Sequence, residues 1–235
     1  MTSSTVKASY LRGLRDGAPF ILMVVPFALV FGVAAREAGL DMAQIVGFSL
    51  LVIAGASQFA ALQLMLDNAA IALVLLAALA VNLRMAMYSA ALVPHLGAAP
   101  LWQRALVAYV NFDQSYLVST AEYEARPGMS LPDKVAFFLG VASLIAPGWM
   151  LATVVGARVG AVIPESWPLD FIVPIMFLAM VAPMLRTLAH VVAAGVAAVL
   201  GLALMGLPSG LGLLIAAGCA MLAGALTETW LEARR

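Results

Sequence analysis

The sequence predicts an all-α polytopic integral membrane protein. Of its 235 residues, 64% are hydrophobic and only 10% are charged, whereas a soluble domain typically carries about 25% charged residues. The sequence also contains several apolar runs of the length, about 20 residues, that an α-helix needs to cross roughly 30 Å of hydrocarbon. Because no polar stretch is long enough to fold by itself, we expect one transmembrane domain over residues 1–235.

Runs with few or no charges predict eight membrane-spanning helices. The expected spans are residues 17–35, 42–66, 68–96, 101–120, 135–157 and 171–185, with two more inside 187–227. A single helix over 187–227 would be about 60 Å long, so this run must fold back, with Gly-Leu-Pro-Ser-Gly at 206–210 as its turn. The first span resembles a signal sequence but exceeds the usual apolar region of about 7–15 residues. If the short sixth span merges with the seventh or re-enters, the count falls to seven.

The distribution of Lys and Arg predicts the orientation. Eight spans place both termini on one side, and with the N-terminus inside, eight basic residues fall on inner segments and three on outer ones. The inner ones are Lys7, Arg12, Arg15, Arg126, Lys134, Arg186, Arg234 and Arg235, and the outer ones are Arg36, Arg104 and Arg158. Cytoplasmic loops carry an excess of Lys and Arg, so we expect both termini in the cytoplasm and a multi-pass protein of the cell membrane.

A faint internal similarity suggests two halves, residues 1–125 and 130–235. Pro26 and Pro147 each lie in the opening span of a half, and each is followed by a glycine and then an arginine. Four spans per half would make the two halves parallel in the membrane. Transporters are often built from such repeats.

Polar side chains interrupt the apolar sequence at 54–59, 81–85 and 109–114, and we expect these places to meet in one site. Arg84 is the most costly of them, since a lone Arg at the centre of a span costs about 2.5–3.5 kcal/mol. It should therefore face protein or water, where Tyr88, one turn on, could share its face. A binding role, a structural ion pair and a side chain reaching the outer surface all remain open.

Asp113, twelve residues into the fourth span, is the natural partner of Arg84. On a continuous helix it would belong to one polar stripe with its neighbours one and two turns away. The stripe and the residues flanking it are Tyr109, Asn111, Asp113, Gln114, Tyr116 and Thr120. A buried carboxylate can take up and release a proton, as a proton-coupled carrier requires. A fixed salt bridge with Arg84 is the alternative.

Small residues followed by Ser57 and Gln58 interrupt the second span. They permit close packing of helices, and Gly55 also permits local unwinding. An unwound point exposes peptide groups at membrane depth, which is tolerated beside protein or a wet cavity and is a recurring way to hold substrates. The spacing does not choose between a packing seam and an unwound binding segment.

The remaining reactive side chains indicate no catalytic or metal centre. Cys219 has no second cysteine to pair with, and the two histidines, His95 and His190, are more typical of packing than of proton transfer. No phosphate-binding loop, zinc-protease motif or nucleophile elbow is present, so we expect no enzyme and no cofactor. The balance of twelve basic and twelve acidic residues gives no indication of nucleic-acid binding.

These motifs together resemble the AzlC family, the large subunit of two-component branched-chain amino acid exporters. The resemblance rests on Gly-Ala-Ser-Gln-Phe at 55–59, on Asn82-Leu83-Arg84, on the region of Asp113, and on the Pro-Phe and Phe-Gly pairs at 26–27 and 31–32. Family members often have Asp-Glu where this chain has Asp113-Gln114, so any coupling role of that Glu would fall to Asp113. The resemblance implies an exporter of leucine, isoleucine and valine, with methionine as a possible fourth substrate, and a small membrane partner, an AzlD-like subunit.

Such a substrate suits the polar residues chemically. A zwitterion must lose water from two charges at once, which is costly without partners. Arg84, or the backbone from Gly55 to Gln58, would hold the carboxylate, and Asp113, Asn82 or Gln114 would receive the ammonium group. We therefore expect export by alternating access, driven by a proton gradient. A carrier for another small metabolite and a membrane scaffold without transport activity are the alternatives.

Overall fold

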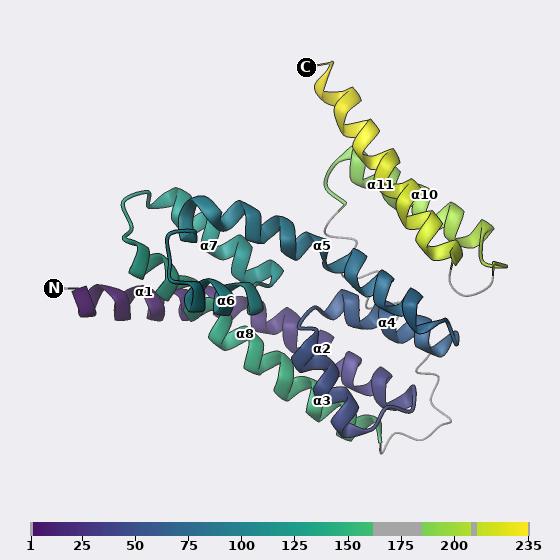
Figure 1. Cartoon of the computed structure of the whole chain (residues 1–235), viewed down its shortest axis with the longest axis horizontal. Coiled ribbons are helices and arrows are strands. Elements are labelled where there is room, and N and C mark those ends of the chain that lie inside the picture. The colour runs from purple at the N-terminus through teal and green to yellow at the C-terminus, as the bar shows by residue number, and fades with distance from the viewer. Residues whose placement is uncertain (1, 162–184, 208–210, 235) are drawn as a thin grey trace. The chain divides into compact units, whose positions relative to one another are not determined.

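The computed structural model describes residues 2–161, 185–207 and 211–234, and within these ranges every regular element is a helix (Figure 1). The protein is therefore all-α, as expected. The chain forms two compact units, one of residues 1–59 and 78–165 and the other of residues 60–77 and 166–235. The predicted sixth span, 171–185, lies almost wholly outside the described residues. The orientation of the termini and the halves 1–125 and 130–235 stay predictions.

In the described part of the chain, three helices are long and apolar enough to cross a membrane. They are Val6–Glu37, α5 (Ile71–Leu96) and α8 (Leu131–Gly160). The first consists of α1 (Thr2–Gly17), the 3-10 turn η1 (Ala18–Phe20) and α2 (Ile21–Glu37) in direct succession. They correspond to the predicted first, third and fifth spans, but two of them start well before the apolar run. Uncharged runs mark the part of a helix that suits lipid, and the helix itself continues past them.

Two predicted spans, the second and the fourth, are each divided into two short helices. Residues 42–66 form α3 (Met42–Leu51) and α4 (Gly55–Leu66), and residues 101–120 form α6 (Leu101–Tyr109) and the first part of α7 (Asp113–Ala125). Unwinding next to Gly55 was one of two open alternatives, and the structure contains it, at residues 52–54. The break at 110–112 was not expected. It makes the predicted single stripe wrong, because Tyr109 ends α6 whereas Asp113 begins α7.

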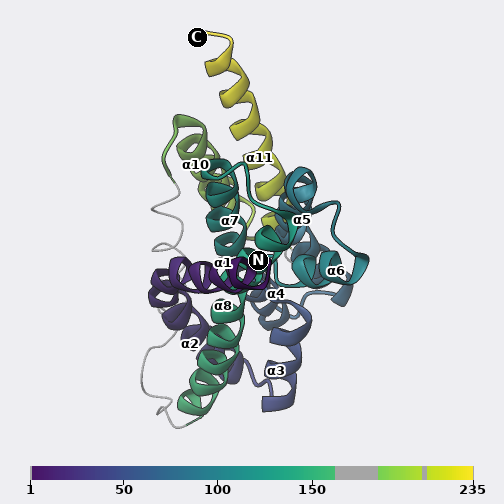
Figure 2. The same cartoon turned by 90° about the vertical axis from the view of Figure 1, so that its left-hand side faces the viewer.

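The core of the first unit is the contact between the long N-terminal helix and α8, which lie side by side in Figures 1 and 2. Glycines let the backbones touch: a Cβ added to Gly32 would collide with the carbonyl oxygen of Thr153, and one added to Gly156 with that of Leu29. Close approach through small residues is a common way to join helices in lipid. A ring cluster that includes Phe31 and Trp149 fills the space beside this seam.

The second unit contains a helical hairpin of α10 (Leu188–Ala203) and α11 (Leu211–Glu232). The Cβ of a residue replacing Gly212 would meet Leu204, and one replacing Gly224 would meet Ala193, so the two helices run antiparallel. The predicted fold-back of the run 187–227 is thereby confirmed.

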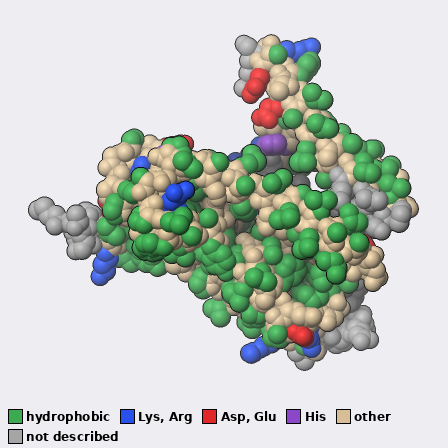
Figure 3. Space-filling model, in the orientation of Figure 1, with side chains coloured by type: hydrophobic (Ala, Val, Ile, Leu, Met, Phe, Trp, Pro, Cys, Tyr) green, Lys and Arg blue, Asp and Glu red, His purple; other side chains and the backbone are tan. Residues whose placement is uncertain are grey.

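Large apolar side chains cover much of the surface of each unit. Leu22 and Leu51 are 83% and 85% exposed, and green hydrophobic side chains are spread over the face shown in Figure 3, where charged side chains are few. A soluble protein rarely exposes contiguous apolar surface on this scale. The surface therefore suits a lipid environment.

Candidate functional site

Arg84 and Asp113 form an ion pair inside the first unit. Arg84 lies in the middle of α5, thirteen residues after Ile71 and twelve before Leu96. Its Nη1 lies 3.1 Å from Oδ2 of Asp113, the first residue of α7. The α7 N-terminus carries a partial positive charge, which also stabilises a carboxylate at this position. The expected partnership is therefore present, and Arg84 does not extend alone toward a surface.

Two tyrosines stand beside the ion pair. Tyr88 lies one turn after Arg84 on α5 and so shares its face of the helix. Its ring stacks on that of Tyr116, with centroids 4.2 Å apart and an interplanar angle of 8°. The stacked rings join α5 to α7 directly next to the charges, so they fix the distance across which the charges interact.

The pair retains unused hydrogen-bonding atoms. Nε of Arg84 and Oδ1 of Asp113 are both buried, and within the described residues neither has a hydrogen-bond partner. Buried polar atoms are normally hydrogen-bonded, so an unpaired donor and an unpaired acceptor beside the same ion pair require an explanation. A ligand with one acceptor and one donor group, or water, would satisfy both.

The break between α6 and α7 holds the Asp113 carboxylate in position, because hydrogen bonds fix the residues around it. The Asn111 side chain donates to the Ser89 hydroxyl on α5 at 3.3 Å, and the backbone N–H of Phe112 donates to the Ser115 hydroxyl at 2.8 Å. Ser115 in turn donates to the carbonyl of Val110 at 3.1 Å. These side chains supply the bonds that a continuous helix would have made. Asn111 was expected from the sequence, whereas Ser89 and Ser115 were not.

Ser57 and Gln58 lie in the first turn of α4, after the other break, and both are fully buried. The Ser57 hydroxyl donates to the carbonyl of Ala78 on α5 at 3.0 Å, and the Gln58 amide donates to Ser49 at 3.0 Å. Ala78 precedes Asn82 by one turn of α5, so Ser57 reaches the helix that carries Arg84. Ser49 is a further polar partner, which was not expected from the sequence.

Other predicted site residues take different positions. Tyr109 donates to the carbonyl of Leu50 at 2.8 Å and is otherwise half exposed. Gln114 follows Asp113 in the first turn of α7 and is partly buried, as is Asn82, whose Oδ1 has no hydrogen-bond partner in the described chain. Gly55 packs against aromatic rings, since a Cβ there would lie 2.6 Å from Phe27 and from Trp149.

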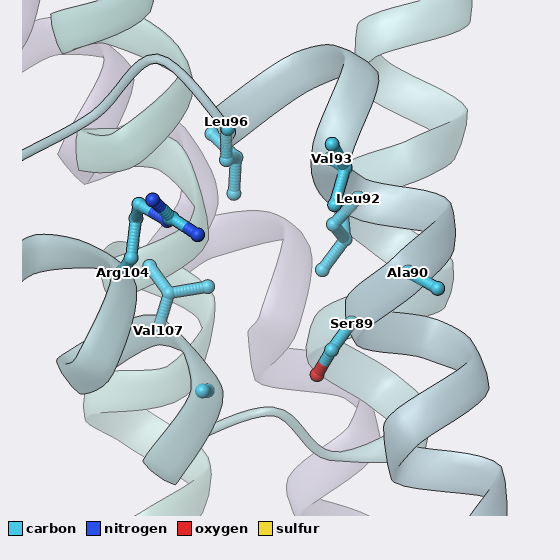
Figure 4. Close-up of a pocket in the computed structure, with 9 residues that line it drawn as sticks. Ser89, Ala90, Leu92, Val93, Leu96, Arg104 and Val107 are labelled. Atoms are coloured by element: carbon cyan, nitrogen blue, oxygen red, sulfur yellow. The ribbon is translucent and has the colours of Figure 1, made fainter. Parts of the chain in front are cut away.

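A cavity of about 290 Å³ lies between α5 and α6, beside the site (Figure 4). Its walls are mainly apolar, and Ser89, which binds Asn111, lines it together with Arg104. Among the residues that the structure describes, no three His, Cys, Asp or Glu side chains lie close enough to hold a metal ion.

The geometry thus combines an Arg in the middle of one helix, its Asp partner at the start of another, and two interrupted spans. No solved structure matches the chain. The inner membrane protein YgaZ of Escherichia coli K12 is 25% identical over 225 residues, which cover 90% of this chain and 89% of that protein. An uncharacterized membrane protein of Archaeoglobus fulgidus is 29% identical over 243 residues, covering 98% and 99%. One from Helicobacter pylori 26695 is 26% identical over 156 residues, covering 65% and 66%.

These similarities support a multi-pass membrane protein of transporter type. The family described as AzlC protein matches residues 19–163, a segment that contains both interrupted helices and the ion pair. The match covers more than half of the sequence, and the chain belongs to the AzlC family.

Proposed function

We propose that this protein exports branched-chain amino acids, namely leucine, isoleucine and valine with methionine as a possible fourth substrate, together with a small AzlD-like membrane subunit. The observation that carries the proposal is the Arg84–Asp113 pair at the middle of α5. Membership of the AzlC family supports a transporter. The substrate class and the small subunit are inferred from the resemblance of the sequence motifs to those of the AzlC family, and both belong to the proposal.

The unused atoms of the pair match the two charged ends of an amino acid. Nε of Arg84 is a donor suited to a carboxylate, and Oδ1 of Asp113 is an acceptor suited to an ammonium group. A zwitterion binding there would add no net charge to a site that is already neutral. It would also regain hydrogen bonds in place of the water that both of its ends must lose.

The surroundings of the pair suit an aliphatic side chain. The Tyr88 and Tyr116 rings offer flat apolar faces next to the charges. Peptide groups at the break 110–112 lie beside the pair, and those at 52–54 adjoin Ser57, which is bonded to α5. Backbone that is unwound at membrane depth is characteristic of substrate sites in transporters.

Asp113 is the proposed coupling group. Ionised Asp113 would accept the ammonium group of a substrate that enters from the cytoplasm. Protonation from the outer side would remove this acceptor and favour release of the substrate there, and loss of the proton to the cytoplasm would restore the carboxylate for the next substrate. The cycle moves one proton inward for each substrate that moves outward and needs no further cofactor.

The test is counterflow of labelled leucine in proteoliposomes that contain the protein with its small subunit. Arg84→Ala and Asp113→Asn should reduce counterflow to the level of empty vesicles. The matched controls are Arg158→Ala and Asp67→Asn, which change exposed residues of the same types and should leave it intact. Wild-type counterflow in both site variants would remove the proposed site.

The same preparation separates the alternatives. If the substrate class is right, unlabelled amino acids with aliphatic side chains should inhibit the counterflow of labelled leucine more than other amino acids do. For a carrier of another metabolite, none of these amino acids would compete. A scaffold without transport activity would give no counterflow of any amino acid, with or without the small subunit. A proton-driven mechanism further requires that an imposed pH gradient accumulates leucine in wild type and not in Asp113→Asn.

A further inference from the structure

The two divided spans are hairpins that fold back on themselves. In the first, α3 and α4 meet across the break: Gln58 donates to Ser49, and the rings of Phe48 and Phe59 both pack on Phe31. Residues 49 and 58, and likewise 48 and 59, lie at nearly equal distances on either side of residues 52–54. Contacts paired in this way arise between antiparallel arms and cannot occur along one straight helix.

The arms of the second hairpin run in opposite directions along α5. After a link of four residues, α6 starts beside the C-terminal end of α5 and leads to Asn111, which is bonded to Ser89, seven residues before that end. Figure 4 shows the α6 residues Arg104 and Val107 facing the last turns of α5. This arm therefore runs antiparallel to α5.

The other arm returns parallel to α5. Asp113 pairs with Arg84, and Tyr116 stacks on Tyr88. Further along, the Tyr123 ring lies 5.1 Å from that of His95 at the end of α5. Since α7 then leads into α8, the start of α8 must also be near the end of α5. Lys134 of α8 confirms this, with its Nζ 3.5 Å from Nδ1 of His95.

We propose that α3–α4 and α6–α7 are re-entrant hairpins that enter the membrane from opposite sides and meet at the polar site. Each arm has 9 to 13 residues, or about 14–20 Å of helix, roughly half of the hydrocarbon thickness. The two tips touch, because the Tyr109 hydroxyl at the end of α6 donates to the carbonyl of Leu50 near the end of α3. The inference does not depend on the substrate.

The arrangement makes residues 21–66 and 71–125 an inverted repeat. Each consists of a long helix, a link of four residues, a short arm, a break of three residues and a second short arm that has a buried serine at its third position, Ser57 or Ser115. Because each hairpin leaves the membrane on the side where it entered, the long helices α2 and α5 point in opposite directions. Inverted repeats with discontinuous helices at the midplane are a recurring architecture of transporters.

The distribution of charge favours this topology independently of the contacts. It places Lys7, Arg12, Arg15, Arg104, Arg126 and Lys134 on the side of α1, and Arg36 and Arg158 on the other side. Alternating spans would instead move Arg104 across, giving five against three within residues 2–161. A division of six basic residues against two is more uneven than five against three, and cytoplasmic loops carry such an excess of Lys and Arg.

Cysteine labelling distinguishes the two topologies at two loops. In a Cys219→Ser background, single cysteines replace Ala38, Asp67, Ala98 and Gly128 in the four links, and a membrane-impermeant maleimide is applied to intact and permeabilised cells. We expect Asp67→Cys to label together with Ala38→Cys from one side, and Ala98→Cys together with Gly128→Cys from the other. Alternating spans predict that Asp67→Cys sorts with Gly128→Cys. That result would overturn the inverted repeat, and so would a labelling pattern in which one of the two hairpins crosses the membrane and the other does not.

A cross-link provides a second measurement that does not depend on the permeability of the label. A short bis-maleimide should link His95→Cys to Lys134→Cys, whose native side-chain tips lie 3.5 Å apart, and mass spectrometry of the membrane fraction detects the linked product. If α6–α7 crossed the membrane, these positions would lie on opposite sides, about 30 Å apart. Absence of the cross-link, in protein whose two cysteines each react singly with a permeant maleimide, would also overturn the proposal.

Discussion

Removing the charge of Asp113 separates a structural role of the ion pair from a role in transport. Asp113→Asn keeps the shape of the side chain but leaves the guanidinium of Arg84 without its counter-charge. At the 3.1 Å separation of Nη1 and Oδ2, the Coulomb attraction is about 5 kcal/mol for an effective dielectric constant of roughly 20. Desolvation of the two groups offsets much of this attraction.

The net cost is bounded by what a lone Arg costs within a membrane-spanning helix. That cost is about 2.5–3.5 kcal/mol at the helix centre, where Arg84 lies in α5. We therefore expect Asp113→Asn to lower the free energy of unfolding by about 3 kcal/mol, which is roughly a 100-fold change in the ratio of folded to unfolded protein. Denaturant unfolding in detergent micelles measures this loss.

The double variant Arg84→Gln with Asp113→Asn removes both charges. The side chains of the pair are 29% and 42% exposed, and replacing both members of such a pair by neutral groups changes stability little. We therefore expect the double variant to unfold within about 1 kcal/mol of wild type. The double-mutant cycle then gives the coupling energy of the pair. Transport should remain lost, because neither end of a zwitterion would find its partner.

Two outcomes would refute this reasoning. Unchanged stability of Asp113→Asn would mean that the pair is hydrated enough to lose its partner at no cost. Full recovery of both stability and transport in the double variant would mean that the charges only hold α5 and α7 together. A lipid-facing control, Leu51→Ala, should leave both quantities close to wild type, since this side chain is 85% exposed.

Three further predictions follow from contacts in the first unit. Gly156→Ala should lower the free energy of unfolding by about 1–3 kcal/mol through overpacking against Leu29. Its control, Gly47→Ala, has open space at its Cβ and should be neutral or stabilise the protein by up to about 1 kcal/mol. Thermal unfolding of the two variants measures the difference. Tyr109→Phe removes the 2.8 Å bond to Leu50, which should cost about 1 kcal/mol and increase maleimide access to a cysteine at position 50. Gln58→Met should change the unfolding free energy by less than about 1.5 kcal/mol and yet lower leucine counterflow, whereas unaltered counterflow would restrict Gln58 to packing.

The membrane class and the polar residues could be predicted from the sequence, because both depend on composition and on the cost of charges in lipid. The break at 110–112 could not be predicted from apolar runs, since Val-Asn-Phe contains neither Gly nor Pro. Its signal was present in another form: Asn111, Asp113 and Ser115 are residue types that bond to local backbone and start helices. Hydropathy counts apolar residues and is insensitive to where the backbone turns, so two hairpins appeared as two spans.

The position of the polar groups argues for a role beyond holding the fold together. A pair such as Arg84 and Asp113 stabilises the fold little, because apolar side chains in its place would stabilise the fold as well without the cost of desolvating two charges. Each break also gives up helical hydrogen bonds at a depth where lipid offers none in return. Both costs fall at the same place, since Asp113 directly follows the break at 110–112 and the tip of the same hairpin bonds to Leu50 beside the other break. A chain selected for stability alone would keep these features apart or lose them. Their coincidence is expected where exposed peptide groups and opposite charges must together replace the water around a substrate that is charged at both ends.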